Sequence, residues 1–372
     1  MKLGILCTMI NGFGRRGYYN SQEIGLGRAL ARKGHEVMIY KGIDPSEKEE
    51  KVQVEKNLTI WYLPMKHLGA HGFMDCKNLD PQLKALFCFG DQQIFLPHVY
   101  RWCRRRRIPF AAYVGTAHSL DSNFKSKVMN ALFAAGTLRI YKKNPVLAKT
   151  SAAKEELRQL GIPHAVIAPV GLDTAVLKKN IPADEKMRLR KEHGFEADDV
   201  ILCNVSRLSW EKRPLELIDL FLQVKGKKKF KLIIVGNGPL EEELNEKIRK
   251  NGLEKEVKIY PNVPYEKMWE IYEMSDHYLN MNKGEIFGMA IMEAVYYKTS
   301  VAAIRALGPS VTLKDMKGHK LCENDDEMAE WITGPYPSEK DLQESSEKMA
   351  ATFTWDRCAD AFLQASSEKS SR

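Results

Sequence analysis

The chain has 372 residues, of which 44% are hydrophobic and 28% are charged, and its formal net charge is +9. A chain of this length is too long for one ordinary hydrophobic core, so we expect two domains. The composition is that of a globular protein, and no apolar run reaches the roughly 18 residues of a membrane span. The N-terminus enters a strand without a signal-peptide cleavage site, so we expect a cytoplasmic protein.

The seven cysteines are odd in number and scattered along the chain. No pair has the spacing of metal ligands, so we expect reduced, mostly buried thiols and no metal site.

The positive charge is concentrated in the first half of the chain. Residues 1–175 carry 26 Lys and Arg against 14 Asp and Glu, a balance of +12, whereas the remaining residues carry 31 against 34. We therefore expect the first half to face something anionic, such as a membrane surface, a nucleic acid or a phosphorylated acceptor.

The first half begins with a βαβ unit. An apolar strand over 2–8 is followed by a glycine-containing loop, a helix over 21–33 and a strand over 37–40, which predicts a parallel sheet. Gly12, Gly14 and Gly17 satisfy the dinucleotide-binding spacing G-x-G-x-x-G. However, two arginines fill variable positions and no acidic residue follows the next strand, so the match is weak.

Further strands are predicted over 59–63, 92–97 and 109–114, with a loop over 66–80 and a helix between the last two strands. That helix ends in a basic run, Arg101, Arg104, Arg105, Arg106 and Arg107. Cations complement the dipole of a helix C-terminus, but this run exceeds that need. It is either a solvated helix end or a patch for an anionic membrane surface. No nucleic-acid-binding motif accompanies it, so nucleic acid is not expected.

His118 follows the strand over 109–114, at the ligand-binding edge of the sheet, where it is either structural or part of a site. Helices are predicted over 127–138 and 152–160, the second capped by Thr150 and Ser151. Strands are predicted over 144–149 and 165–168, and the charged segment 174–199 is the best domain boundary.

The second half repeats the alternation of strands and helices, which predicts a second Rossmann-like domain. The predicted strands are 200–205, 231–235, 257–260, 276–281 and 301–304. The predicted helices are 215–224, 240–251, 265–274 and 289–297, with a final helix that ends near residue 365.

One strand–turn–helix segment carries two glutamates eight residues apart, Glu285 in the turn and Glu293 in the helix. The helix N-terminus near Gly288 offers unpaired N–H groups and partial positive charge, which suit a phosphate. Carboxylates beside an anion site are costly unless they bind hydroxyl groups. The segment is therefore either a capped helix with two solvated glutamates or a site for a ligand that carries both phosphate and sugar.

Two cations favour the ligand site. Arg207 and Lys212 lie in the loop after the strand over 200–205, at the same edge of the second sheet. Together they form a candidate diphosphate clamp, although each by itself reads equally well as a solvated surface charge.

Several motifs in the right order resemble the retaining glycosyltransferases of family 4. Residues 285–288 followed by Glu293-Ala294 resemble the E-x7-E motif of that family, and residues 206–214 resemble its diphosphate-binding loop. Residues 34–37, 169–173 and 235–240 resemble further family motifs, so the resemblance covers about residues 1–365.

The resemblance implies the α/β GT-B fold, in which two Rossmann-like domains face each other across a cleft. Residues 1–172 would form an acceptor-side domain and residues 173–350 a nucleotide-sugar-binding domain. Residues 351–372 would form a helix that crosses back to the first domain.

The resemblance also implies roles for individual residues. Glu285 would contact hydroxyls of the transferred sugar, and Glu293 would hold the ribose. Arg207 and Lys212 would neutralise the diphosphate leaving group. The other implied positions are Gly17, where the backbone approaches the donor, Asn262 and Val263 beside the nucleobase, Phe287 and Gly288 at the helix N-terminus, and His118 near the reaction centre.

The implied reaction is a metal-independent transfer of a hexose-type sugar with retention at the anomeric carbon. The donor is a nucleotide-diphospho-sugar, with a UDP-sugar favoured, and it is a co-substrate, so no cofactor is expected. The acceptor is a glycan, a lipid-linked molecule or a small molecule, and the basic run suggests peripheral binding at the inner face of the membrane.

Two other classes remain open. A non-catalytic nucleotide-sugar-binding protein of the same fold is the alternative, and an NAD-dependent dehydrogenase would need an acidic residue that is missing after Tyr40. The chain also departs from the family pattern. Tyr18 replaces a glycine, Ile286 replaces a common glycine, and residues 306–310 replace a Gly-Gly pair, which bears on the contacts to the donor sugar.

Overall fold

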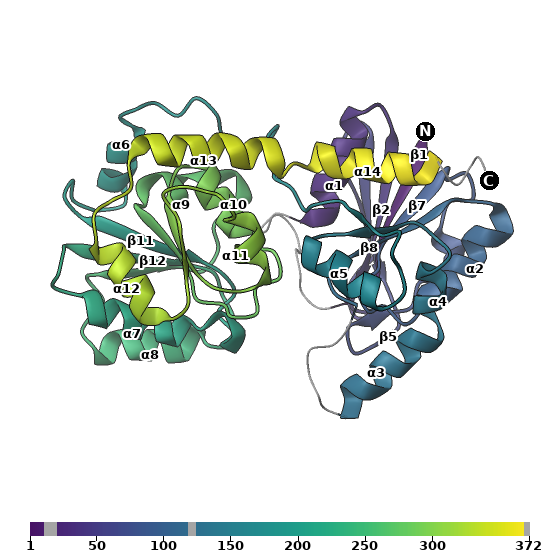
Figure 1. The fold of residues 1–372 in the computed structure, drawn as a ribbon, viewed down its shortest axis with the longest axis horizontal. Coiled ribbons are helices and arrows are strands. Elements are labelled where there is room, and N and C mark those ends of the chain that lie inside the picture. The colour runs from purple at the N-terminus through teal and green to yellow at the C-terminus, as the bar shows by residue number, and fades with distance from the viewer. Residues whose placement is uncertain (11–20, 118–123, 368–372) are drawn as a thin grey trace. The chain divides into compact units, whose positions relative to one another are not determined.

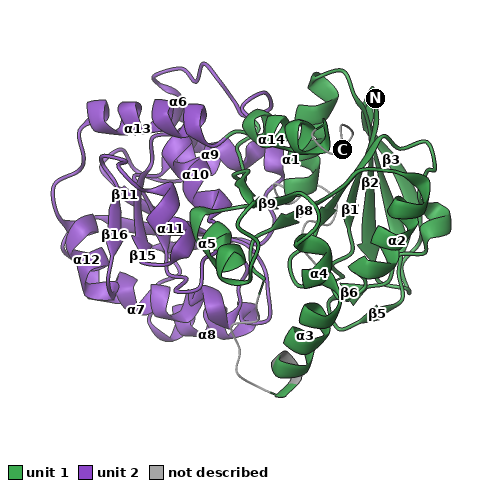
Figure 2. Cartoon of the chain, turned by 45° about the vertical axis from the view of Figure 1, so that its right-hand side comes forward, with its two compact units in different colours: residues 1–14, 21–173, 354–372 green, residues 15–20, 174–353 purple. Residues whose placement is uncertain are grey.

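The structure, a computed structural model, describes residues 1–10, 21–117 and 124–367 (Figure 1). The chain divides into two compact units, shown in different colours in Figure 2. Among the described residues, unit 1 joins 1–10, 21–117 and 124–173 with 354–367, and unit 2 contains residues 174–353. Gly17 and His118, two residues of the expected site, lie outside the described residues.

Unit 1 is an α/β unit. Its strands are β1 (Lys2–Cys7), β2 (Glu36–Ile43), β3 (Glu50–Glu55), β4 (Leu58–Pro64), β5 (His67–Leu68), β6 (His71–Gly72), β7 (Ala85–Phe89), β8 (Phe110–Val114), β9 (Val146–Ala148) and β10 (Val166–Ile167). Its helices are α1 (Gln22–Arg32), η1 (Cys76–Asn78), α2 (Leu96–Arg106), α3 (Phe124–Ala135), α4 (Thr137–Tyr141), α5 (Ser151–Gln159) and α14 (Trp355–Ser367).

Eight of these strands form one sheet in the order β10-β9-β8-β7-β1-β2-β4-β3. Neighbouring strands are parallel except for β3, which runs antiparallel to β4. Every residue of β8 is buried, as expected for a parallel strand that is covered on both faces.

The strand predicted over 92–97 is wrong. The strand at this place is β7, which ends at Phe89, and the apolar residues that follow begin helix α2. Leu96, Val99 and Cys103 are the buried residues of α2, and their spacing is helical. Pro97 is tolerated because it lies in the first turn, where its missing N–H would have no partner.

The final helix belongs to unit 1. Figure 1 shows α14 beside α1, and Trp355 of α14 is fully buried. Gly25 of α1 leaves room for this indole, because a Cβ built there would lie 2.1 Å from its Nε1 atom. Arg32 of α1 binds Asp173 at 2.9 Å and Asp356 at 3.2 Å, so α1 ties together the two stretches of chain that build unit 1.

Unit 2 is a second α/β unit. Its strands are β11 (Val200–Val205), β12 (Phe230–Val235), β13 (Val257–Tyr260), β14 (His277–Asn280), β15 (Ser300–Ile304) and β16 (Lys320–Cys322). Its helices are α6 (Glu185–Glu192), η2 (Trp210–Lys212), α7 (Pro214–Val224), α8 (Glu241–Lys250), η3 (Tyr265–Lys267), α9 (Met268–Met274), α10 (Met289–Tyr296), α11 (Leu307–Thr312), α12 (Asp325–Thr333) and α13 (Glu339–Thr352).

The sheet of unit 2 is parallel throughout, in the order β13-β12-β11-β14-β15-β16. From β11 the chain proceeds outward through β12 and β13, and it then returns to place β14 on the other side of β11. The carboxyl ends of β11 and β14 therefore form a topological switch point, where ligands bind in open α/β sheets.

All seven cysteines are buried free thiols, as expected. Within the described residues, no helix is both long and apolar enough to span a bilayer.

Candidate active site

The switch point of unit 2 brings two of the expected residues together. Lys212 ends the short helix η2 after β11, and Glu285 lies in the loop between β14 and α10. Lys212 Nζ donates to Glu285 Oε2 at 2.8 Å, and the two side chains are only 19% and 15% exposed. A cation and a carboxylate therefore meet in a partly desolvated position at the ligand-binding edge of the sheet.

A small asparagine network orients Glu285. Asn282 Nδ2 donates to the same Oε2 atom at 3.1 Å, while Asn282 Oδ1 accepts from the Gly284 N–H at 2.9 Å. The Asn282 N–H in turn donates to Asn280 Oδ1 at 3.1 Å. The loop that carries Glu285 is thus fixed by its own polar side chains.

The surroundings of Glu285 favour its ionised form. Burial by itself raises the pKa of this carboxyl group. The charge of Lys212 and the hydrogen bonds from Lys212, Asn282 and Asn280 outweigh burial, and the pKa lies below its ordinary value. Glu285 is therefore a hydrogen-bond acceptor at neutral pH, which suits contacts to sugar hydroxyls.

Arg207 lies in the same loop as Lys212 but nearer to solvent. Its Nη2 atom donates to Glu211 at 2.9 Å across an exposed pair. The loop is held from β12, because the Leu208 N–H donates to the Asn237 carbonyl at 2.9 Å. Gly236, at φ 143°, permits this approach, since a Cβ there would lie 1.9 Å from the Ser206 carbonyl oxygen.

The N-terminus of α10 follows Glu285 directly. Gly288 precedes the helix in a left-handed conformation, φ 84°, which is easy only for glycine. The Phe287 ring is buried and packs edge-on against the Phe353 ring, with 6.0 Å between the ring centroids. This packing anchors the turn, so the first N–H groups of α10 lie immediately beyond Glu285.

Glu293 lies one helical turn deeper and is 5% exposed. Its Oε2 atom accepts a hydrogen bond from the Tyr272 hydroxyl at 2.9 Å. The glutamate expected to hold a ribose is therefore also bound within the protein core.

Asn262 and Val263 follow β13, two strands away from β11. The side chain of Asn237 bridges this loop to the Gly236 turn, donating to Asn262 Oδ1 at 2.8 Å and to the Pro261 carbonyl at 3.1 Å. Asn262 is exposed and Val263 partly so. These residues lie on the same edge of the sheet as Lys212.

The carboxyl edge of the sheet in unit 1 holds an ion pair that sequence reasoning missed. Asp91 Oδ1 accepts from the Gly115 N–H at 2.6 Å, and Asp91 Oδ2 lies 3.4 Å from Lys149 Nζ. Asp91 follows β7 and Lys149 follows β9, at the positions that had drawn attention to His118 after β8. Their place just after parallel strands was the signal that could have revealed them.

Two surfaces of unit 1 bear on the expected membrane contact. Arg101, Arg104, Arg105, Arg106 and Arg107 are all exposed at the C-terminal end of α2. On α3, Phe124, Val128 and Leu132 recur every four residues and are 83%, 42% and 47% exposed. The opposite face of α3 is buried through Met129 and Phe133, and the helix sequence contains no acidic residue.

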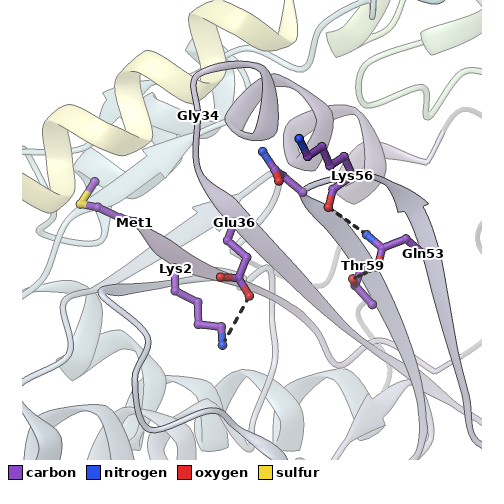
Figure 3. A pocket seen from close by; sticks show the side chains of 8 residues that line it. Met1, Lys2, Gly34, Glu36, Gln53, Lys56 and Thr59 are labelled. Carbon is purple, nitrogen blue, oxygen red and sulfur yellow. Dashed lines mark hydrogen bonds and ion pairs between the residues drawn. The ribbon is translucent and has the colours of Figure 1, made fainter.

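A pocket of about 490 Å³ lies elsewhere, at the amino ends of β1, β2 and β4 (Figure 3). It is lined mainly by polar groups, among them Lys2, Glu36 and Thr59, and Lys2 and Glu36 are paired at 3.4 Å. Parallel sheets bind ligands at the opposite edge, so we do not assign the donor to this pocket.

Two Rossmann-like units, one with paired charges at a switch point beside a helix N-terminus, define a protein of the GT-B fold. Sucrose-phosphate synthase from Thermosynechococcus elongatus aligns over 100% of this chain and 99% of its own, with a TM-score of 0.75 and 15% identity. Anabaena HepE in complex with UDP aligns over 99% of this chain and 100% of its own, with a TM-score of 0.72 and 16% identity.

The sequence comparisons match part of the chain to a known family. Residues 185–348 match the family described as "Glycosyl transferases group 1". A D-inositol 3-phosphate glycosyltransferase of Xylanimonas cellulosilytica is 24% identical over 97% of this chain and 94% of its own length. The chain therefore has the GT-B fold, and residues 185–348 of its second unit are similar to glycosyl transferases group 1.

Proposed function

We propose that the protein is a retaining glycosyltransferase that moves a hexose-type sugar from a nucleotide-diphospho-sugar, with UDP as the favoured nucleotide. The observation that carries the proposal is the Lys212–Glu285 pair, 2.8 Å apart at the switch point and next to the N-terminus of α10. The similarity of the fold to HepE, whose structure contains UDP, supports the choice of nucleotide.

In this proposal the diphosphate draws Lys212 away from Glu285. Lys212 and Arg207 then neutralise the departing phosphate, assisted by the N–H groups that follow Phe287 and Gly288. Glu285, released from its cation, accepts hydrogen bonds from the hydroxyls of the transferred sugar. Because Glu285 and Lys212 are partners in the structure, each of these two partly buried charges is compensated.

The remaining expected residues complete the donor site. Glu293 binds the ribose, Asn262 and Val263 flank the nucleobase, and Gly17 and His118 act from the first half of the chain. During transfer the bond between the anomeric carbon and the phosphate oxygen breaks, and a bond to the acceptor oxygen forms on the same face. The acceptor proton passes to the leaving phosphate, so the step needs no metal and no cofactor.

The acceptor is a glycan, a lipid-linked molecule or a small molecule, and the surface of unit 1 favours the lipid-linked class. An exposed apolar stripe on a helix without acidic residues is typical of a segment that lies in the interface of an anionic membrane. The arginines at the end of α2 add positive charge to the same unit. We therefore propose that the protein works on the cytoplasmic side of a membrane as a peripheral protein.

A donor panel tests the proposal. UDP-, GDP- and ADP-sugars are compared by thermal shift, and release of free sugar or product from the best donor is then followed by mass spectrometry. Glu285→Ala is expected to lower turnover about 10²- to 10³-fold with little change in donor affinity. Glu293→Gln is expected mainly to weaken donor binding, while Glu192→Gln on α6 serves as an exposed control.

Three outcomes decide between the hypotheses. Turnover that depends on Glu285 supports the glycosyltransferase assignment with these roles. Donor binding without turnover on a broad acceptor panel would favour the alternative, a non-catalytic nucleotide-sugar-binding protein. Equal and negligible effects of both glutamate substitutions would indicate that residues 285–293 have only a structural role.

A further inference from the structure

Two exposed apolar side chains flank Glu285. Ile286, the next residue, is 39% exposed, and Leu307, the first residue of α11, is 56% exposed. Apolar side chains exposed to solvent are ordinary when they are scattered singly. Beside a charged pair at a ligand-binding edge, they instead indicate which part of the ligand has to be apolar.

Backbone packing places the start of α11 against the turn that carries Ile286. The Gly308 N–H donates to the Glu285 carbonyl at 2.8 Å. A Cβ on Gly308 would lie 2.6 to 2.7 Å from backbone atoms of Phe287, so the start of α11 presses directly on the turn that contains Ile286. Within this turn the Phe287 ring is buried, whereas the Ile286 side chain is exposed.

A third apolar side chain lies on the same edge. Trp210, in the short helix that ends at Lys212, is 67% exposed. The strands β11, β14 and β15 are neighbours in the sheet, and the loop or helix start after each of them presents one of these residues. We call Trp210, Ile286 and Leu307 the apolar rim.

We propose that the apolar rim selects a donor sugar that carries a methyl group, either in an N-acetyl substituent or as a 6-deoxy carbon. The inference rests on the proposed function, because it assumes that the transferred sugar binds beside Glu285. Hydroxyl groups of a sugar need hydrogen-bond partners, which Glu285 and Asn282 can supply and the rim cannot. A methyl group against Ile286 and Leu307 instead removes apolar surface from water.

The expected selectivity is moderate. One methyl group in an apolar pocket changes binding by about 10- to 200-fold, and such a pocket rejects a hydroxyl isostere only weakly. The rim is partly open, so we expect a preference near the lower limit, about 10-fold.

The test uses donor pairs that share a nucleotide. Dissociation constants are measured by isothermal titration calorimetry for UDP-N-acetylglucosamine against UDP-glucose, and for GDP-6-deoxymannose against GDP-mannose, with free UDP and GDP as references. The first pair reports on an N-acetyl methyl and the second on a 6-deoxy methyl. We expect the methyl-bearing member of at least one pair to bind about 10-fold more tightly.

The variant Ile286→Ser/Leu307→Ser is expected to bring that ratio close to one. Met187→Ser, an exposed apolar residue on α6, is the matched control and should keep the ratio of the parent protein. If the double variant does not fold, as judged by circular dichroism, the single variants Ile286→Ala and Leu307→Ala replace it.

Tight binding of both members of every pair without preference would overturn the inference while leaving the proposed function intact. A preference that survives in the folded rim variants would overturn it as well. Failure of all four sugars and both nucleotides to bind would overturn the proposed function and the inference together.

Discussion

Lys212 and Glu285 form an ion pair, and each is proposed to contact a different part of the donor. The ion pair is 2.8 Å long and partly buried, and it supports the ionised form of the carboxyl group. Removing one partner would leave the other charge desolvated, which costs more than losing an exposed ion pair. The pair therefore links the stability of unit 2 to the state of the donor site.

This link predicts a pH-dependent effect of Glu285→Gln. A carboxyl group whose pKa is lowered on folding stabilises the protein above its unfolded pKa, and the gain disappears as the pH falls through the folded value. The difference in unfolding free energy between the parent and Glu285→Gln should therefore be largest near pH 7 and shrink below about pH 4.5, the ordinary value of the group. Urea unfolding at a series of pH values measures it.

An exposed pair provides the control for this experiment. Glu246 and Lys250 are also 2.8 Å apart, but on the solvent face of α8. Glu246→Gln should change stability little at any pH. Equal pH profiles for Glu285→Gln and the parent protein would show that the Lys212–Glu285 pair contributes nothing to folding.

The contact between α11 and the turn before α10 requires a glycine at position 308. A Cβ atom at position 308 would lie 2.6 to 2.7 Å from the backbone of Phe287, so the two segments leave no room for a side chain there. The contact also fixes the carbonyl of Glu285. An element that was not expected from the sequence thus supports the residue that was expected to touch the sugar.

Gly308→Ala should destabilise the protein by roughly 1 to 3 kcal/mol, because the added methyl group forces the two segments apart. The same shift should weaken donor binding. Gly284→Ala, in the same turn, is the matched control, since its Cβ would meet only Asn282 Oδ1 at 3.6 Å. Thermal unfolding and donor titration of both variants decide, and similar behaviour of the two would disprove the role of the contact.

The positions of the strands could be predicted from the sequence more accurately than the contacts between side chains. Strongly apolar runs such as β11 and β12 were found within a residue or two, because parallel strands buried on both faces leave little ambiguity. The segment around Leu96 was predicted as a strand because its apolar run is short. A short apolar run does not distinguish a strand from the start of a helix. Helices α6, α12 and α13 were missed because they are largely polar and their helical period is weak.

The sequence predicts at which edge of the sheet the candidate-site residues lie, but not which of their side chains bind each other. Lys212 and Glu285 could be placed on one edge of the sheet, because both follow parallel strands. That they bind each other, and that Glu293 binds Tyr272, depends on side-chain geometry between segments far apart in the chain. Asp91 and Lys149 were missed because neither belongs to a motif, and the roles of all these residues remain predictions.

At the scale of the molecule, the chain passes from unit 1 to unit 2 and back again. The last described helix, α14, completes the core of unit 1 through Trp355 and Phe362. The centroid of the Phe362 ring lies 4.6 Å from the ring centroid of Phe87 in β7 and 5.3 Å from that of Tyr113 in β8. Unit 1 thus depends on residues separated by more than 200 positions along the chain.

Phe362→Ala should destabilise unit 1 by roughly 3 to 5 kcal/mol, the usual cost of removing a buried phenyl ring. Hydrogen exchange should accelerate in β7 and β8 and remain unchanged in β11 and β12. Phe124→Ala, which removes an exposed ring in the same unit, should leave both sheets protected. Acceleration confined to unit 2 would contradict the assignment of α14 to unit 1.

The interrupted course of unit 1 also sets the order in which the nascent protein can mature on the ribosome. Residues 174–353 are continuous in sequence, so unit 2 can close as soon as its last helix has left the exit tunnel. The sheet of unit 1 is synthesised first. The apolar surface that packs against Trp355 and Phe362 stays uncovered until residues 354–367 emerge. The half of the protein that is translated first is therefore completed last, and its apolar face stays exposed in the interval, which favours binding by a chaperone.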